Sequence, residues 1–133
     1  GLQQALREVV DELSARAGTE IGLDYRLGDL PLSVNEEFHL LQIAREALTN
    51  VVRHARAEHA LIRLERDEDG EVLVLVEDDG RGIQPDSGGE GHHGMSIMRE
   101  RARQLGGSLD VDEGAGGTGT CVEMRFRPRS AGH

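Results

Sequence analysis

The stretch REALTNVVRHA, Arg45–Ala55, is the most informative part of the sequence because it combines an apolar helical repeat with a polar stripe. Glu46, Asn50 and His54 recur every four residues, so they rise along one side of a helix. At about 100° per residue, this stripe is predicted to lie roughly 140° from the centre of the apolar face. The residues of that predicted face are Leu41, Ala44, Leu48, Val51 and Ala55. Such a stripe is usually a solvated flank, but a carboxylate and an amide one turn apart also suit a hard cation such as magnesium.

Helical and strand-like patterns alternate on both sides of this stretch. Apolar residues at three- and four-residue spacing predict helices, and alternating apolar and polar residues predict strands. Asp69-Gly70 marks a hairpin turn, and glycines mark helix ends. The predicted helices are Leu2–Ala17, about Val34–Arg56 and Gly94–Leu105, and the predicted strands are Ile21–Leu27, Ala60–Leu64, Val72–Val76, Leu109–Val111 and Cys121–Phe126.

This order of elements predicts an α+β fold. Three helices are too few to cover both faces of a five-stranded sheet, so the economical architecture is a two-layer sandwich with the helices on one face. Local hairpins make the sheet mixed or largely antiparallel. At 133 residues, the chain is expected to form a single domain, residues 1–133.

Composition limits the possible functions. The net charge of -10 disfavours direct binding to nucleic acid or to an anionic membrane, because both require a basic surface. All fifteen basic residues are Arg, so a Walker-type phosphate loop with its essential Lys is excluded. The single cysteine, Cys121, allows no internal disulfide; a small buried residue in a reducing, cytoplasmic compartment is expected.

A second polar cluster, VEDDGRGI, Val76–Ile83, follows an apolar strand. Asp78 and Asp79 are expected at the end of that strand, where Gly80 and Gly82 let the backbone turn and approach a ligand closely. An acidic turn without a ligand is the plain alternative, because Asp and Gly are common in turns.

A third cluster, GEGHHGMSIMRERARQLGG, Gly89–Gly107, is rich in glycine at first and then helical. Free backbone amides and the positive end of the helix dipole favour a phosphate at such a junction. An ordinary loop followed by a capped helix is equally compatible with the sequence. Twelve of the eighteen glycines lie between Gly80 and Gly119, so conformational freedom is concentrated in one half of the chain.

Taken in order, these clusters resemble the four nucleotide-binding boxes of sensor histidine kinases, which share a superfamily with DNA gyrase, heat-shock chaperone ATPases and mismatch-repair ATPases. REALTNVVRHA resembles the N box, EDDGRGI the first glycine box, GHHGMSIMRERA the second and GGTGTCVEMRF the third. The N box and the second glycine box resemble most closely the nitrate/nitrite sensor kinase subfamily. Most of the wider subfamily has G-x-G-L where this chain has His92 and Met95 as its first and last residues.

The resemblance implies that the chain binds ATP and Mg²⁺. Glu46 and Asn50 would be the catalytic residues and would hold the metal against the phosphates, since carboxylate and amide oxygens suit a hard ion. Arg53 and His54 would face the phosphate oxygens. Asp78 would accept a charge-assisted hydrogen bond from the adenine amino group. The other nucleotide-binding residues implied are Gly80, Gly82, Ile83, Gly94, Met95 and Thr120, with a lid loop over about residues 83–93.

The implied function is that of the catalytic domain of a two-component sensor histidine kinase, which transfers the γ-phosphoryl group of ATP to a histidine. None of the six histidines lies in the H-[DE] motif of a phosphoacceptor helix. That histidine is therefore expected on a separate dimerisation domain, with relay to a response regulator that has a DNA-binding output.

The full-length protein is expected to be a membrane-anchored homodimer with this domain in the cytoplasm. The fragment alone is expected to be a monomer that autophosphorylates slowly or not at all. Two alternatives stay open: a noncatalytic nucleotide-sensing module, and an anti-sigma-type serine kinase of the same fold.

Overall fold

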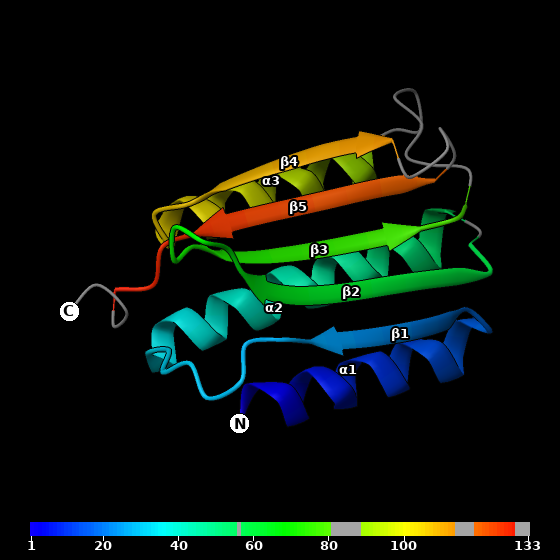
Figure 1. Ribbon diagram of the computed structural model, residues 1–133. Helices are drawn as coiled ribbons and strands as arrows, with labels where there is room; N and C mark the ends of the chain where they lie inside the picture. The colour runs from blue at the N-terminus through cyan, green and yellow to red at the C-terminus, as the bar shows by residue number, and fades with distance from the viewer. Residues whose placement is uncertain (56, 81–88, 114–118, 130–133) are drawn as a thin grey trace.

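Three helices form one layer of the computed structural model, and α2 packs between the other two (Figure 1). Helix α1 spans Leu2–Ala17, α2 spans Val34–Asn50 and continues as a π-helical turn, η1, at Val51–Ala55, and α3 spans Gly89–Gln104. The structure describes residues 1–55, 57–80, 89–113 and 119–129, with only the backbone of 54–55, 89–95 and 113. Within these ranges, no helix has the length and apolar character of a membrane span.

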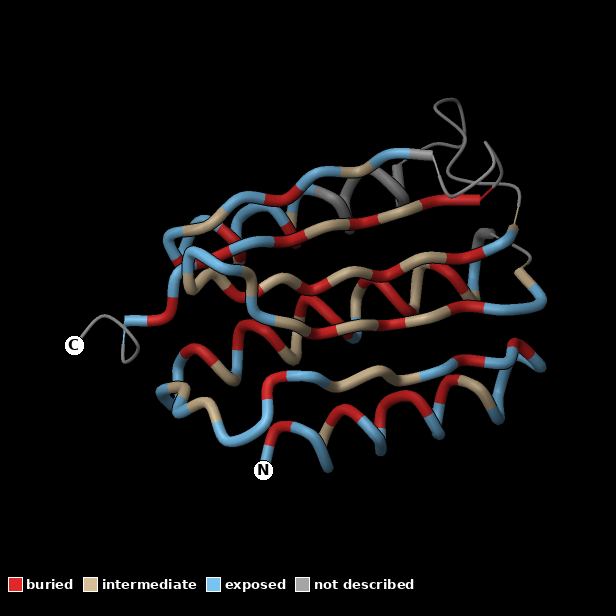
Figure 2. Tube along the Cα trace, in the orientation of Figure 1, coloured by how far each residue is buried: buried red, intermediate tan, exposed pale blue. Residues whose placement is uncertain are grey.

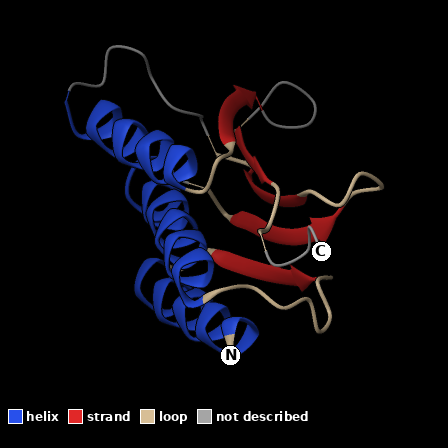
Figure 3. Ribbon diagram, turned by 90° about the vertical axis from the view of Figure 1, so that its left-hand side faces the viewer, coloured by secondary structure: helices blue, strands red, loops and turns tan. Residues whose placement is uncertain are grey.

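Five strands form the second layer, and all three helices lie on one side of it (Figure 3). The strands are β1 at Glu20–Tyr25, β2 at His59–Arg66, β3 at Val72–Asp78, β4 at Ser108–Glu113 and β5 at Thr120–Phe126. Their order in the sheet is β1-β2-β3-β5-β4. Strands β1 and β2 are parallel, and the other neighbouring pairs are antiparallel. The predicted α+β sandwich with a mixed sheet is therefore confirmed.

Buried aliphatic residues of the helices and strands form the core. Figure 2 marks these buried positions in red along both layers. On β3, Val72, Val74 and Val76 are buried, while the residues between them are only partly buried. Successive strand residues face opposite sides of a sheet, so the next position that faces the helices is Asp78. The regular burial pattern of the strand thus carries a carboxylate to the edge of the core.

The beginning of α2 is fixed by a buried carboxylate. Ser33 Oγ accepts a hydrogen bond from the Glu36 amide at 3.0 Å, and Glu36 Oε1 accepts one from the Ser33 amide at 2.8 Å, forming a capping box. Glu36 Oε2 also accepts a hydrogen bond from the Arg129 amide at 2.8 Å, which ties the chain beyond β5 to this helix. Glu36 therefore both caps α2 and joins it to a distant segment of the chain.

Three sequence-based predictions need correction. The helix beginning at Val34 is α-helical only to Asn50, because one extra residue per turn enters the backbone at η1. Helix α3 begins at Gly89, not at Gly94. A glycine costs a helix about 1 kcal/mol, and an existing helix gains one hydrogen bond with each added residue, so the run of glycines does not stop it. Cys121 is only partly buried, because it lies on the side of β5 away from the helices.

Candidate functional site

The segments that carry the polar clusters meet at one end of the molecule. The C-terminal end of α2, the end of β3 and the beginnings of α3 and β5 all lie there (Figure 1), although α3 begins at the outer side of the helix layer, away from the sheet (Figure 3). Antiparallel pairing of β3 with β5 brings Glu77 opposite Cys121, which places the start of β5 beside the end of β3. Elements from four distant parts of the sequence therefore begin or end at the same end of the molecule.

Asn50 contributes a buried polar group to this region. Its Nδ2 atom is buried and has no hydrogen-bond partner within the described part of the chain. An unpaired polar atom at such a position is costly, so a ligand that satisfies it would be favoured. The Nδ2 donor suits an acceptor such as a phosphate oxygen, and Oδ1 of the same amide could bind a cation.

The predicted angle between the polar stripe and the apolar face of α2 was too large. Leu40, Ile43 and Ala47 are also buried, and they move the centre of the buried face toward Asn50. With about 100° per residue, the angle from Asn50 to that centre falls from roughly 140° to about 90°. Asn50 therefore lies at the margin of the core, and one turn earlier Glu46 is partly buried. Arg53, in η1, is exposed.

Asp78 is the buried carboxylate at the end of β3, with only 8% of its surface exposed. Its Oδ1 accepts a hydrogen bond from the Gly80 amide at 2.8 Å. Burial raises the pKa of Asp78, and the neighbouring charge of Asp79 adds to the increase. Hydrogen bonds from the Gly80 and Thr120 backbones oppose the increase. A carboxylate with few neutralising partners is well suited to accept a hydrogen bond from a ligand.

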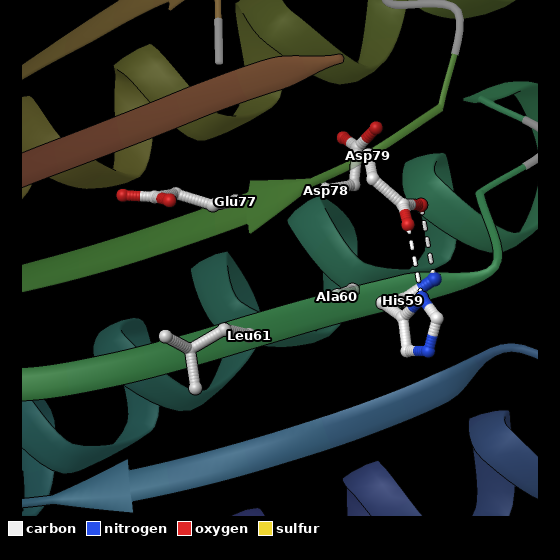
Figure 4. A pocket seen from close by; sticks show the side chains of 6 residues that line it. All are labelled: His59, Ala60, Leu61, Glu77, Asp78 and Asp79. Carbon is white, nitrogen blue, oxygen red and sulfur yellow. Dashed lines mark hydrogen bonds and ion pairs between the residues drawn. The ribbon is translucent and has the colours of Figure 1, made fainter. Parts of the chain in front are cut away.

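Asp79, the next residue, has the opposite environment. Its Oδ1 accepts hydrogen bonds from the amides of Glu58 at 2.9 Å and His59 at 3.0 Å, and its Oδ2 lies 3.0 Å from His59 Nδ1. Figure 4 shows Asp79 directed to His59 and Asp78 directed away from it. The His59 backbone and side chain are the main reasons why the pKa of Asp79 is lowered. Both acids lie at the end of β3 as predicted, but only Asp78 faces the helices.

A shallow pocket of about 250 Å³ lies over β2 and β3 (Figure 4). It is lined by His59, Ala60, Leu61, Glu77, Asp78 and Asp79. His59, Leu61, Glu77 and Asp79 occupy strand positions on the face opposite the helices, and Asn50 is not part of the lining. Most of the lining therefore lies on the side of the sheet away from the helices, although Ala60 and Asp78, at helix-facing positions, also belong to it.

Gly119 is a structural residue of the site that the sequence interpretation missed. It is buried with φ of 73°, and a Cβ atom there would collide with the Asp78 backbone carbonyl. The next residue, Thr120, is also buried and its backbone contacts Asp78, so this predicted residue lies beside the carboxylate. Gly119 lies in GGTGTCVEMRF, the stretch that resembles the third glycine box, but the sequence analysis gave this glycine no role of its own.

Several predicted residues cannot be compared in the same way. Gly82 and Ile83 lie outside the described residues, and so does the side chain of His54. Gly94 and Met95 have a described backbone and lie within α3, five and six residues after its first residue. Because the first four amides of a helix are the unpaired ones, the free amides of α3 in this structure are shifted toward Gly89.

The donor set at this end of the molecule fits magnesium when a nucleotide supplies the other ligands. Across the described ranges, no group of three or more His, Cys, Asp or Glu side chains could hold a metal by itself. Mg²⁺ commonly takes one or two protein oxygens, with phosphate oxygens and water completing its octahedron. Glu46 and the buried, unpaired amide of Asn50 match that requirement.

Comparison with known families agrees with this arrangement. Residues 35–130 match the family described as histidine kinase-, DNA gyrase B-, and HSP90-like ATPase. The chain belongs to this family. The match includes α2, the end of β3, α3 and β5, which are the elements that build the site.

Relatives of the chain include sensor proteins and sensor histidine kinases. The chain is 42% identical to the nitrate/nitrite sensor protein NarQ of Escherichia coli strain K12 over 126 residues, which cover 95% of this chain and 22% of NarQ. It is 32% identical to the sensor histidine kinase LiaS of Bacillus subtilis strain 168, over 94% of this chain and 34% of LiaS. The chain thus spans only about a fifth to a third of the length of these relatives.

Solved structures of histidine kinases have the same fold. The blue-light activated histidine kinase of Erythrobacter litoralis EL346 superposes with a TM-score of 0.76 and 27% identity, over 94% of this chain and 44% of that protein. Full-length ShkA, solved in complex with AMPPNP, gives a TM-score of 0.77 and 26% identity, over 95% of this chain and 30% of ShkA.

We predict that Gly119→Ala displaces Asp78. Gly106→Ala is the matched control, because Gly106 has a similar φ of 77° but no atom within 4 Å of the position that a Cβ would occupy. The control should lose about 1 kcal/mol of unfolding free energy for the left-handed backbone, and Gly119→Ala should lose at least about 2 kcal/mol more, because the Asp78 backbone must also move. Urea unfolding followed by circular dichroism measures both. Equal losses would mean that the contact with Asp78 is not restrictive.

Proposed function

We propose that the chain is the catalytic domain of a two-component sensor histidine kinase, which binds Mg²⁺-ATP and donates its γ-phosphoryl group to a histidine on a separate dimerisation domain. The observation that carries the proposal is that two buried polar groups, the Asp78 carboxylate and the unpaired Nδ2 of Asn50, belong to the ends of β3 and α2, which lie at the same end of the molecule (Figure 1). Family membership and the kinase names of the relatives support the same assignment.

Adenine recognition is assigned to Asp78. Its carboxylate faces the helices at the end of β3 and can accept a hydrogen bond from the exocyclic amine. The flanking glycines Gly80 and Gly82 and the side chain of Ile83 would leave room for the base, and Thr120 would close that end. Guanine carries a carbonyl oxygen where adenine carries the amine, so the same carboxylate would repel it.

The phosphates are assigned to the other side of the site. Glu46 and Asn50 would bind Mg²⁺, which neutralises phosphate charge, and Arg53 and His54 would face phosphate oxygens. The first turns of α3, including Gly94 and Met95, would add backbone amides; this requires the helix to begin closer to Gly94 when nucleotide is bound. Phosphoryl transfer depends mostly on such positioning and charge neutralisation, with little covalent work by the protein.

The partners follow from this chemistry. The γ phosphorus would leave the bridging oxygen of ADP and bond to an imidazole nitrogen of the phosphoacceptor histidine, and a response regulator would then take the phosphoryl group. We place the domain on the cytoplasmic side of a membrane-anchored homodimer, where ATP is available.

We predict that Asp78→Asn weakens ATP binding about tenfold or more, because a hydrogen bond to a charged group is replaced by a neutral one. GTP binding should stay constant or improve, because the new amide can donate to the guanine carbonyl. Burial raises the pKa of Asp78, so its ionisation lowers stability as the pH rises through that pKa, and the variant should unfold at an equal or higher temperature.

Titration calorimetry with ATP and GTP measures these affinities. Asp110→Asn, on the exposed side of β4, is the control and should behave like the original protein. Equal losses of ATP and GTP affinity would contradict the assignment of Asp78 to the base.

We also predict that removal of magnesium weakens ATP binding through Glu46 and Asn50. In the original protein, EDTA should reduce ATP affinity about tenfold, or about 1.4 kcal/mol. In Asn50→Ala or Glu46→Gln, the difference between Mg²⁺ and EDTA should nearly vanish. Glu37→Gln, at the start of the same helix, should keep the full difference. A normal magnesium effect in both site variants would remove these residues from the metal site.

Kinase activity is testable by fusing the chain to a cognate histidine-bearing dimerisation domain and adding ATP labelled at its γ-phosphate. We predict acid-labile, base-stable label on histidine, which Asn50→Ala should abolish. Label on serine of a partner protein would instead support the serine kinase. Nucleotide binding without any transfer would support the noncatalytic sensing module.

A further inference from the structure

The residue next to the proposed adenine-binding carboxylate makes an unusually complete set of contacts. Asp79 Oδ1 accepts hydrogen bonds from the Glu58 and His59 amides, its Oδ2 meets His59 Nδ1, and its own amide donates to the His59 carbonyl at 3.2 Å. Asp79 is nevertheless exposed. Its contacts therefore fix one backbone geometry between the end of β3 and the beginning of β2.

This geometry determines where Asp78 lies. Asp78 and Gly80 are the two neighbours of Asp79 in the chain, and they are joined by the hydrogen bond from the Gly80 amide to Asp78 Oδ1. On the other side, Gly119 packs directly against the Asp78 carbonyl. A rotation of the Asp79 backbone would move the Asp78 carboxylate and Gly80 together.

The same contacts reach the segment that follows the helix of Asn50. The Glu58 carbonyl accepts a hydrogen bond from the Glu20 amide at 2.9 Å, and the Ala57 carbonyl accepts one from Thr19 Oγ1 at 3.0 Å. Residues 57–59 are thus held by β1 on one side and by Asp79 on the other. They connect η1 with β2, so Asp79 links the Asn50 side of the site to the Asp78 side.

We propose that Asp79 is a positioning residue for adenine recognition, and that its pair with His59 makes nucleotide affinity depend on pH. The inference rests on the proposed function, because it assumes that Asp78 binds the base. Asp79 itself is directed to His59 and away from Asp78 (Figure 4), so its side chain would not contact a base bound by Asp78. Its effect is exerted through the backbone of residues 78–80.

The charges around His59 set the sign of the pH effect. Its ring faces Asp79 beyond β3 and Glu20 of β1, whose Oε2 lies 3.6 Å from Nε2, and Glu58 and Glu77 are also nearby. The hydrogen bond with Asp79 is the main reason why the pKa of His59 is raised; desolvation opposes the increase, and the charges of Asp79, Glu20 and Glu58 add to it. The ion pair is therefore complete below the ordinary His pKa of about 6.5 and is lost as the pH rises through the raised value.

Two Asp79 variants separate positioning from folding. Asp79→Ala removes the side-chain contacts to Glu58 and His59. It should lower ATP affinity about tenfold while GTP affinity changes less than about twofold, so the preference for ATP over GTP should fall. Asp79→Asn keeps an oxygen for the two amides and should restore most of the preference. Glu77→Gln, which lines the same outer pocket, is the matched control and should bind both nucleotides normally.

A His59 variant tests the pH effect. Asn can place a nitrogen near the position of His Nδ1 but does not titrate, so His59→Asn should remove the protein's share of the pH dependence. We expect the ratio of the original protein's ATP affinity to that of the variant to fall about two- to fivefold between pH 6 and pH 8.5, as for an exposed ion pair. Protonation of the nucleotide affects both proteins equally, so it does not change this ratio.

Titration calorimetry with Mg²⁺-ATP and Mg²⁺-GTP, with thermal unfolding of each variant, gives all these values. A folded Asp79→Ala variant with the original ATP to GTP preference would overturn the inference and leave Asp79 as a structural contact only. If Asp79→Ala does not fold, a pH-independent affinity ratio for His59→Asn would overturn it instead. Absence of nucleotide binding by the original protein would contradict the proposed function, which is a different outcome.

Discussion

Two neighbouring acids at the end of a central strand must face opposite sides of the sheet, and the candidate site depends on this constraint. The pleat carries Asp78 to the helix side, in line with Val72, Val74 and Val76, and carries Asp79 to the solvent side. The buried acid keeps unused capacity to accept hydrogen bonds, whereas the exposed acid is saturated by Glu58 and His59. The alternation of side chains along the strand therefore leaves Asp78 for ligand recognition and Asp79 for structural support.

The groups that we propose bind the ligand lower the stability of the fold at this end of the molecule. Burial of Asp78 disfavours its charged form, and burial of the Asn50 amide leaves Nδ2 without a partner in the described structure. Neither group helps the fold, whereas the aliphatic core between the layers and the Glu36 contacts do. Buried polar groups without enough partners lower stability. Such groups are expected where a ligand supplies the missing interactions. Their concentration at one end of the sandwich is thus more informative than either residue alone.

Much of the fold was predictable because it follows from periodicity. The buried valines of β3 and the Asp69-Gly70 turn fix strand direction and face, and the helix Leu2–Ala17 has the predicted bounds. The burial of Asn50 was not predictable, because it depends on Leu40, Ile43 and Ala47 packing against other elements. The role of Gly119 has the same origin, because Gly119 packs against the Asp78 carbonyl. Each depends on contacts between distant segments, which local propensity does not contain.

The acidic composition is compatible with an anionic ligand because the local charges are compensated one by one. Asp79 is the acid beside Asp78, and its charge is met by two amides and the His59 ring on the outer face. The Gly80 and Thr120 backbones donate toward Asp78, and Arg53 is exposed just after Asn50. The net charge of -10 is therefore a property of the whole surface. Over short distances, oriented amides and individual cations determine the potential that a phosphate meets, so the bulk charge does not exclude ATP.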